Sequence, residues 1–221
     1  MIPRLVVSGT ASGVGKTTVT VALIRALRAR GLSVATFKCG PDYLDPTYHA
    51  RAAEGACHNL DGWMMGKNAV LQTFARAAGG HDIALVEGVM GLFDGASPTS
   101  DAGSTAEVAK WLDAPVALVC DTSGMARSIA ALASGFASFD RELKVAAVIA
   151  NRVGSRRHLE LLRQALASPP IVGGFTDEAE LAFPERHLGL TTAARETVSD
   201  ALLSPQAVAD WITRQLPKAK P

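Results

Sequence analysis

The chain has 221 residues, of which 48% are hydrophobic, 19% charged and 5% aromatic, and its formal net charge is +1. This length and hydrophobic content predict one folded domain covering residues 1–221, and the balanced charge with few aromatic rings excludes the basic or base-stacking surface of a nucleic-acid-binding protein. The three cysteines lack a metal-ligand spacing and are typical of free thiols. Neither a leader peptide nor an apolar run of membrane-spanning length is visible. We therefore expect a cytoplasmic protein with no nucleic-acid or membrane partner.

Short apolar runs alternate with helical stretches along the chain. The runs that predict buried strands are 5–7, 34–37, 83–86, 116–120, 145–150 and 171–172, and the stretches that predict helices are 17–30, 68–78, 104–112, 127–139, 155–167 and 205–216. The strand runs are continuously apolar, which is typical of strands covered on both faces. The sequence therefore predicts an α/β fold with a doubly wound, mostly parallel sheet, in which ligands bind beyond the carboxyl ends of the strands.

A glycine-rich turn joins the first predicted strand to the first predicted helix. It has the context of a phosphate-binding P-loop, although five rather than four residues separate Gly9 from Gly15. In such a loop the lysine reaches the β and γ phosphates, and the threonine hydroxyl binds Mg²⁺. We therefore predict a P-loop NTPase that binds ATP and Mg²⁺ through Gly9, Thr10, Ser12, Gly13, Val14, Gly15, Lys16, Thr17 and Thr18.

Charged residues follow the second and third predicted strands. Lys38 is expected to contact the γ-phosphate and to stabilise charge during its transfer. Asp42 and Asp45 follow in a proline-framed stretch that should be a stiff loop, where they would bind metal or orient an attacking group. Glu87 ends the third run and would be a second ligand for Mg²⁺. The alternative is that these carboxylates are ordinary turn and strand-end residues.

Polar residues also follow the later strands. Asn151 ends the run 145–150, and its carboxamide suits either an adenine edge or the cap of the helix that begins near Ser155. Arg152 adjoins it as a further nucleotide contact. A last set suits an anionic substrate, although each member alone is more often a surface or capping residue: Ser104, Thr105, Arg127, Arg186 and His187.

Five segments, at 9–18, 37–46, 86–95, 151–153 and 184–190, carry a family resemblance. Together they resemble the synthetase domain of the cobyrinic and hydrogenobyrinic acid a,c-diamide synthases, over about residues 4 to 195. That domain belongs to a wider group similar to dethiobiotin synthetase, which has the same widened phosphate loop. The resemblance implies ATP and Mg²⁺ as cofactors and a corrin-type substrate, and the likeness to dethiobiotin synthetase makes a homodimer plausible.

The resemblance also implies a reaction in cobalamin biosynthesis. ATP phosphorylates the a and c acetate carboxylates of a corrin precursor in turn, and ammonia then displaces the phosphate and leaves a carboxamide. By resemblance the metal ligands are Thr17, Asp42 and Glu87, and the residues that face or orient the substrate are Tyr43, Leu44, Asp45 and Asp94. The catalytic set is then Lys16, Lys38, Asp42 and Asp45.

The source of ammonia and the substrate stay open at this point. Members of the family usually continue into a glutamine amidotransferase domain, whose nucleophilic cysteine lies in a Gly-x-Cys-x-Gly turn. Cys39, Cys57 and Cys120 all have other neighbours, so we expect no glutaminase here and no amidation driven by glutamine alone. Ammonia would then come from a glutaminase domain or subunit that is not in this sequence, or be taken up free. The alternatives are a diamide synthase for another tetrapyrrole, such as nickel sirohydrochlorin, and a nucleotide-switch protein with no ligase activity.

Overall fold

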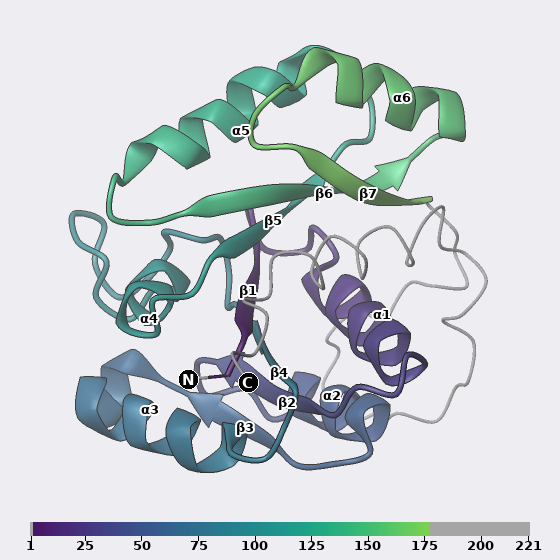
Figure 1. Cartoon of the computed structure of the whole chain (residues 1–221). Helices are drawn as coiled ribbons and strands as arrows, with labels where there is room; N and C mark the ends of the chain where they lie inside the picture. Colours follow the sequence, from purple (N-terminus) through teal and green to yellow (C-terminus); the bar gives the residue numbers. More distant parts are fainter. Residues whose placement is uncertain (1, 177–221) are drawn as a thin grey trace, which may run out of the picture.

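The computed structural model describes residues 2–176, in which strands alternate with helices (Figure 1). The strands are β1 (Arg4–Gly9), β2 (Val34–Cys39), β3 (Cys57–Leu60), β4 (Ile83–Glu87), β5 (Val116–Asp121), β6 (Val145–Val153) and β7 (Ile171–Thr176). The helices are α1 (Lys16–Arg28), α2 (Asp45–Ala53), α3 (Gly62–Ala78), α4 (Thr105–Trp111), α5 (Ser128–Phe139) and α6 (Arg156–Ala165). The predicted alternation is confirmed, whereas the predicted helix 205–216 and the segment 184–190, with Arg186 and His187, lie outside the described residues.

In the described part of the chain the strands form one parallel sheet in the order β3-β2-β4-β1-β5-β6-β7. The chain leaves the central β1 for β2 and β3 at one edge, returns to place β4 beside β1, and then continues through β5, β6 and β7 to the other edge. This confirms the doubly wound parallel sheet. Because β1 is central, the phosphate loop starts at the middle of the carboxyl edge, where such sheets bind ligands.

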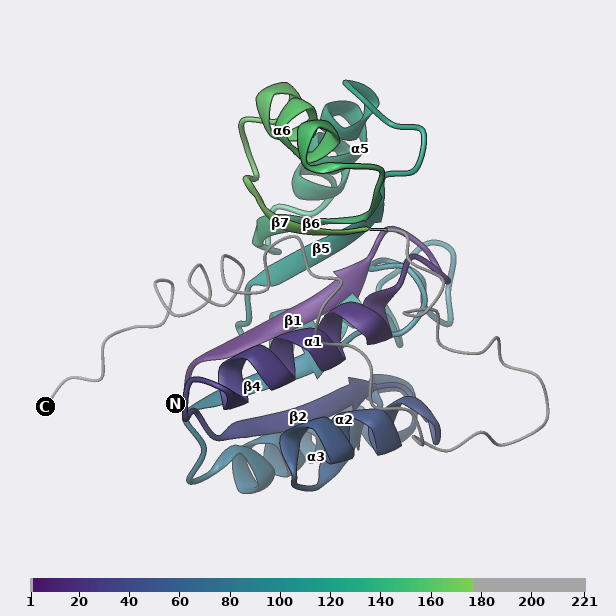
Figure 2. The same ribbon diagram turned by 90° about the vertical axis from the view of Figure 1, so that its right-hand side faces the viewer.

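Helices cover both faces of the sheet. Helices α1 and α2 pack on one face, in a core that includes Val7 and Leu23, and α3 to α6 pack on the other, in a core that includes Val6 and Phe74. Figure 2 shows α1 lying along β1 and β4. Successive strand residues enter opposite cores, which is why the strands are continuously apolar in sequence. None of the described helices is both long and apolar enough to cross a membrane.

Two elements, α2 and β3, were not predicted from the sequence: α2 begins within the stretch after β2 where a stiff loop was expected, and β3 follows it. Pro46 lies in the first turn of α2, where a missing N–H breaks no helical hydrogen bond, so this proline starts a helix. β3 is a four-residue edge strand whose first three residues are only half-buried, and it therefore lacks an apolar run. Helix α3 also begins earlier than predicted, at Gly62, with Asp61 as its cap and a break in the helix at Gly66.

Candidate nucleotide-binding and catalytic site

The phosphate loop joins β1 to α1 and turns at two glycines in the left-handed region, Gly13 at φ 75° and Gly15 at φ 90°. Other residues rarely adopt these angles, so the shape of the loop depends on both glycines. Helix α1 starts directly after Gly15, with no side-chain cap and no acidic residue in its first turn. No side chain of the helix thus competes for its first N–H groups, which is the condition for binding an anion at a helix N-terminus.

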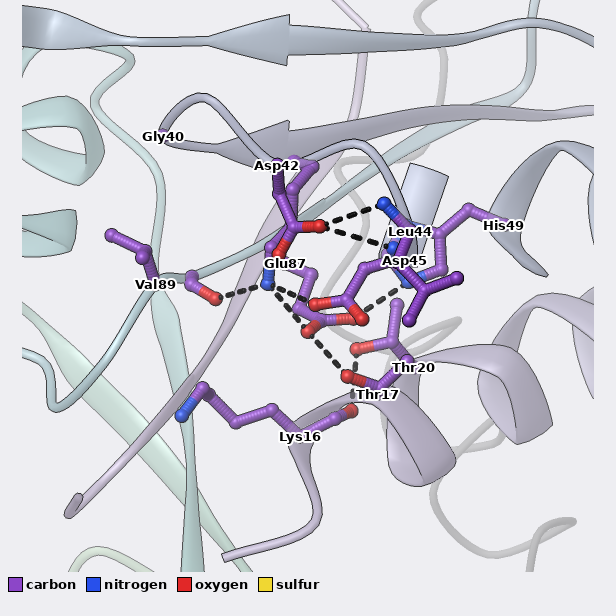
Figure 3. A network of polar contacts seen from close by, with 12 residues as sticks. Lys16, Thr17, Thr20, Gly40, Asp42, Leu44, Asp45, His49, Glu87 and Val89 are labelled. Atoms are coloured by element: carbon purple, nitrogen blue, oxygen red, sulfur yellow. Dashed lines mark hydrogen bonds and ion pairs between the residues drawn. The ribbon is translucent and has the colours of Figure 1, made fainter. Parts of the chain in front are cut away.

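Lys16, the lysine of the predicted loop motif, is almost completely buried. Its Nζ donates a hydrogen bond to the carbonyl of Ala11 at 2.9 Å, so the side chain folds over the loop. Figure 3 shows it extending away from Thr17 and the acidic residues beyond. The ammonium is therefore held at the inner side of the loop, where a phosphate would meet it.

The end of β6 holds the phosphate loop from the side. Nδ2 of Asn151 donates to the carbonyl of Val14 at 2.8 Å, and a guanidinium nitrogen of Arg152 donates to the carbonyl of Gly13 at 3.0 Å. Arg152 also pairs with Asp121 at the end of β5 and has a left-handed φ of 55°. These contacts position the loop, while pairing of Asn151 with adenine stays a prediction.

The structure decides the alternative role that the sequence left open for Asn151. Helix α6 is capped by Ser155, whose Oγ accepts a hydrogen bond from the N–H of His158 at 3.1 Å. Capping by Asn151 is therefore wrong. Asn151 cannot cap α6 because it lies within β6 and its side chain is bonded to the carbonyl of Val14 in the phosphate loop.

A buried charge network lies beside the phosphate loop (Figure 3). Lys38 and Glu87 are register partners on β2 and β4, and Nζ of Lys38 lies 2.8 Å from Oε1 of Glu87. The same Nζ lies 2.8 Å from Oδ2 of Asp45 in α2 and 2.9 Å from the carbonyl of Gly88. The hydroxyl of Thr17 in α1 donates to Oε1 of Glu87 at 2.9 Å. Lys38 and Thr17, which lie in separate segments of the sequence, thus meet at the carboxylate of Glu87.

Burial and pairing set the protonation of this network. Burial alone would raise the pKa of Glu87, but Lys38 and His49 outweigh it and hold that pKa well below its usual range. Burial likewise opposes the charge on Lys38, while Glu87 and Asp45 raise its pKa above the ordinary value. Burial and the neighbouring Glu87 raise the pKa of Asp45 despite its pairing with Lys38. The cluster therefore holds a firmly ionised glutamate and lysine next to the phosphate loop.

Asp42 has a local role at the start of α2. Its Oδ1 accepts hydrogen bonds from the N–H groups of Leu44 at 2.9 Å and Asp45 at 3.2 Å. Burial opposes ionisation, but these N–H groups and Lys38 lower the pKa of Asp42 below its usual range. The turn role that the sequence left as an alternative is therefore present for Asp42, and metal binding by this carboxylate stays a prediction.

His49 belongs to the same network and was not among the residues singled out by the sequence. It lies one helical turn after Asp45 in α2, and its Nε2 forms an ion pair with Oε2 of Glu87 at 2.6 Å. Burial opposes the charge on His49, yet Glu87 raises its pKa to about 9. The signal that could have found it is the i, i+4 spacing from Asp45, which places both side chains on one helix face once α2 is recognised.

The remaining residues predicted to contact the substrate lie outside the charge network of Lys38, Asp45, His49 and Glu87. Ser104 caps α4 by accepting from the N–H of Glu107, and the hydroxyl of Thr105 is bonded to the backbone of Val89, so both are buried in structural roles. Oδ2 of Asp94 accepts from the N–H of Gly91 at 2.9 Å. The other residues of this set differ in exposure, since Tyr43 is 90% exposed, Arg127 is exposed at the start of α5 and Leu44 is half-buried. Their contact with a substrate stays a prediction.

Comparison with known proteins agrees with the geometry of the phosphate loop. Residues 5–180 match the family described as the CobQ/CobB/MinD/ParA nucleotide binding domain. Among solved structures, the chain resembles chloroplast FtsY from Physcomitrella patens with a TM-score of 0.60 at 16% identity, over 96% of this chain and 65% of that one. At that identity the likeness concerns the fold alone.

Curated relatives confirm the resemblance seen in the sequence. The chain is 58% identical over 199 residues to a cobyrinate a,c-diamide synthase of Leptospira interrogans, covering 90% of this chain and 44% of that protein. It is 50% identical over 203 residues to a hydrogenobyrinate a,c-diamide synthase of Streptomyces coelicolor, covering 91% of this chain and 42% of that protein. The chain thus spans less than half the length of these relatives. It belongs to the CobQ/CobB/MinD/ParA nucleotide-binding domain family and has the fold of a P-loop NTPase.

Proposed function

We propose that the chain carries out the ATP-dependent step of corrin amidation, in which the a and c acetate carboxylates of cobyrinic or hydrogenobyrinic acid become carboxamides. The observation that supports this most is the convergence of Lys38, Asp45 and Glu87 beside the phosphate loop. A protein that only binds and releases nucleotide has no evident need for a lysine held between two acids at that place. The names of the close relatives supply the substrate class.

The chemistry asks for positive charge and accurate positioning. A carboxylate is a poor electrophile, because its leaving group would be oxide, and transfer of the γ-phosphate to one of its oxygens supplies a good leaving group. Ammonia then attacks the acyl carbon, and inorganic phosphate departs as the amide forms. Phosphoryl transfer of this kind depends mainly on positioning and charge neutralisation. In this proposal Lys16 and Lys38 supply that charge on two sides of the phosphate.

The residues beside the loop also fit Mg²⁺. Thr17 offers a hydroxyl and Glu87 an ionised carboxylate, and their oxygens lie 2.9 Å apart. Within residues 2–176 no group of three or more His, Cys, Asp or Glu side chains forms a metal cage. That agrees with the usual mode of Mg²⁺, which takes one or two protein oxygens and completes its shell with phosphates and water. When bound with ATP, the ion would neutralise charge on the phosphates; Asp42 is a further predicted ligand.

The proposal is tested with purified chain, ATP, Mg²⁺, ammonium chloride and either corrin acid. We expect phosphate release that depends on the corrin acid, and mass spectra that show first one and then two acid-to-amide conversions. Replacing ammonia by hydroxylamine should trap the acyl phosphate as a hydroxamate. Asp45→Asn should impair amidation more than ATP binding. Phosphate release that no tetrapyrrole acid stimulates would contradict the proposal and favour a nucleotide switch.

A further inference from the structure

Glu87 is held from two opposite sides, each side using a different carboxylate oxygen. Its Oε1 faces the sheet and the phosphate loop, where Lys38 and Thr17 contact it at 2.8 Å and 2.9 Å. Its Oε2 faces α2, where Nε2 of His49 lies 2.6 Å away. In residues 2–176 neither Oε2 nor Nε2 has a hydrogen-bond partner, so the ion pair between these two buried atoms is the polar contact that each one makes. Lys38 and Thr17 therefore fix the carboxylate at Oε1, and His49 fixes it at Oε2.

His49 is itself fixed by its surroundings. Its side chain is completely buried, and its other ring nitrogen, Nδ1, lies 3.7 Å from Sγ of Cys57 at the start of β3. Helix α2, which carries His49, begins with Asp45, and Asp45 is anchored by the pair with Lys38. The ring thus approaches Glu87 from the side away from the phosphate loop and cannot swing out without disturbing α2.

We propose that His49 is a positioning residue, which holds Oε2 of Glu87 so that Oε1 faces Thr17 and is presented to a divalent cation bound with nucleotide. The inference rests on the proposed role of Glu87 as a metal ligand but not on the identity of the organic substrate. Partners of this kind orient the groups that bind a metal, and their loss typically weakens metal binding about 10–100-fold. If His49 had a purely structural role, its replacement would lower the stability of the fold, and metal binding would fall only by the fraction of chains that unfold.

The probe is Mn²⁺, measured by electron paramagnetic resonance in the presence of ADP, because this readout needs neither turnover nor a tetrapyrrole. His49→Leu replaces the imidazole by an apolar side chain of similar size that has no N–H to donate to Glu87. For this variant we expect Mn²⁺ affinity about 10–100-fold weaker. Binding of ADP in EDTA should be unchanged. The matched control is His58→Leu on β3, whose ring contacts Phe37 and lies outside the charge network, and which should leave Mn²⁺ affinity unchanged.

A double-mutant cycle separates positioning from general destabilisation. Glu87→Gln removes the ionised ligand, so adding His49→Leu should weaken Mn²⁺ binding no further if His49 acts through Glu87. An equal loss in both backgrounds, or no loss in either, would overturn the proposal. The double variant buries no unpaired carboxylate and is expected to fold even where His49→Leu alone does not.

A graded series gives a second route if His49→Leu does not fold. His49→Gln carries an amide that can still reach toward Oε2, and His49→Asn carries a shorter one. We expect Mn²⁺ affinity to be highest in the unchanged chain, lower in His49→Gln and lowest in His49→Asn. Equal affinities would contradict the proposal. Failure of the chain to amidate any corrin acid would leave these outcomes readable, so the two proposals fail separately.

Discussion

Lys38 and Asp45 form an ion pair at 2.8 Å with side chains that are only 2% and 7% exposed. Each comes from a different element, since Lys38 is on β2 and Asp45 starts α2. Removing one member of a buried pair leaves a charge without compensation, and here Lys38 compensates Glu87 as well. The pair therefore ties the stability of the domain to the same lysine that is proposed to act on phosphate.

The first prediction concerns this lysine. Lys38→Met should lower the free energy of unfolding by about 3–5 kcal/mol, because Asp45 loses its buried cation and Glu87 keeps only His49. Denaturant unfolding followed by circular dichroism measures the change. Adding Asp45→Asn should restore part of the lost stability, since the carboxylate left without a cation is replaced by a neutral amide. A Lys38→Met chain as stable as the original would show that the network contributes nothing to folding.

The second prediction concerns the curl of the phosphate loop. A Cβ added at Gly15 would lie 2.1 Å from Nδ2 of Asn151, whereas a Cβ at Gly13 would meet no atom within 4 Å. Both positions have left-handed angles, which cost a residue with a Cβ about 1–2 kcal/mol. Gly15→Ala should therefore abolish nucleotide binding in calorimetry, and Gly13→Ala should only weaken it.

The same contact supplies a check on that explanation. The double variant Gly15→Ala with Asn151→Ala no longer has the clash with the carboxamide. It still has the strained φ at position 15, and it lacks the hydrogen bond from Asn151 to the carbonyl of Val14. Nucleotide binding should return in part. No recovery at all would mean that backbone strain, and not the contact with Asn151, is what excludes a side chain at Gly15.

The third prediction concerns thiol reactivity. Burial raises the pKa of Cys39 and of Cys120 to about 12, and both thiols are enclosed in the core, so neither should react with Ellman's reagent in the folded chain. Cys57 is half-buried on β3 and should react first. We expect one thiol to titrate under native conditions and three in guanidinium chloride. Rapid reaction of more than one native thiol would contradict the enclosed positions.

The fourth prediction concerns pH. The pKa of His49 is about 9 in the folded chain and 6.5 at its ordinary value, so the folded state binds the proton more tightly. The stabilisation is complete below about pH 6.5 and is lost as the pH rises through 9, by at most about 3 kcal/mol. The groups that face His49 are Glu87 and Cys57.

The measurement compares the free energy of unfolding of the original chain and of His49→Gln at pH 6.5 and at pH 9. The other titrating groups are common to both proteins and cancel in the difference. The original chain should lose more stability than the variant over this interval. Parallel curves would show that the proton on His49 does not distinguish the folded from the unfolded state.

The sequence predicted the central part of the fold and the phosphate loop because those signals are local. Apolar runs define β1, β2, β4, β5 and β6, and the motif from Gly9 to Thr18 is one unbroken stretch of sequence that runs from the end of β1 into α1. The sequence also placed Lys38 and Glu87 at the ends of strands, where parallel sheets bind ligands. The paired register of β2 and β4 then brings these two residues side by side.

What the sequence did not predict depends on contacts between distant segments. Pro46 and the neighbouring aspartates indicated a turn, so α2 was missed, and with it the helix face that presents Asp45 and His49 together. The capping role considered for Asn151 was wrong for a similar reason, because its partner is the carbonyl of Val14, 137 residues earlier in the chain. Such pairings become visible only when the order of strands in the sheet is known.

Because Asn151 and Arg152 hydrogen-bond to the phosphate loop, nucleotide binding depends on strands from both halves of the sheet. The strand–turn–helix unit of β1 and α1 contains every residue of the loop motif, but the carbonyls of Gly13 and Val14 are anchored by residues of β6. A fragment ending before β6 would keep the motif and lose the anchors. Affinity for ATP would therefore emerge late, only once the second half of the sheet has assembled around the first.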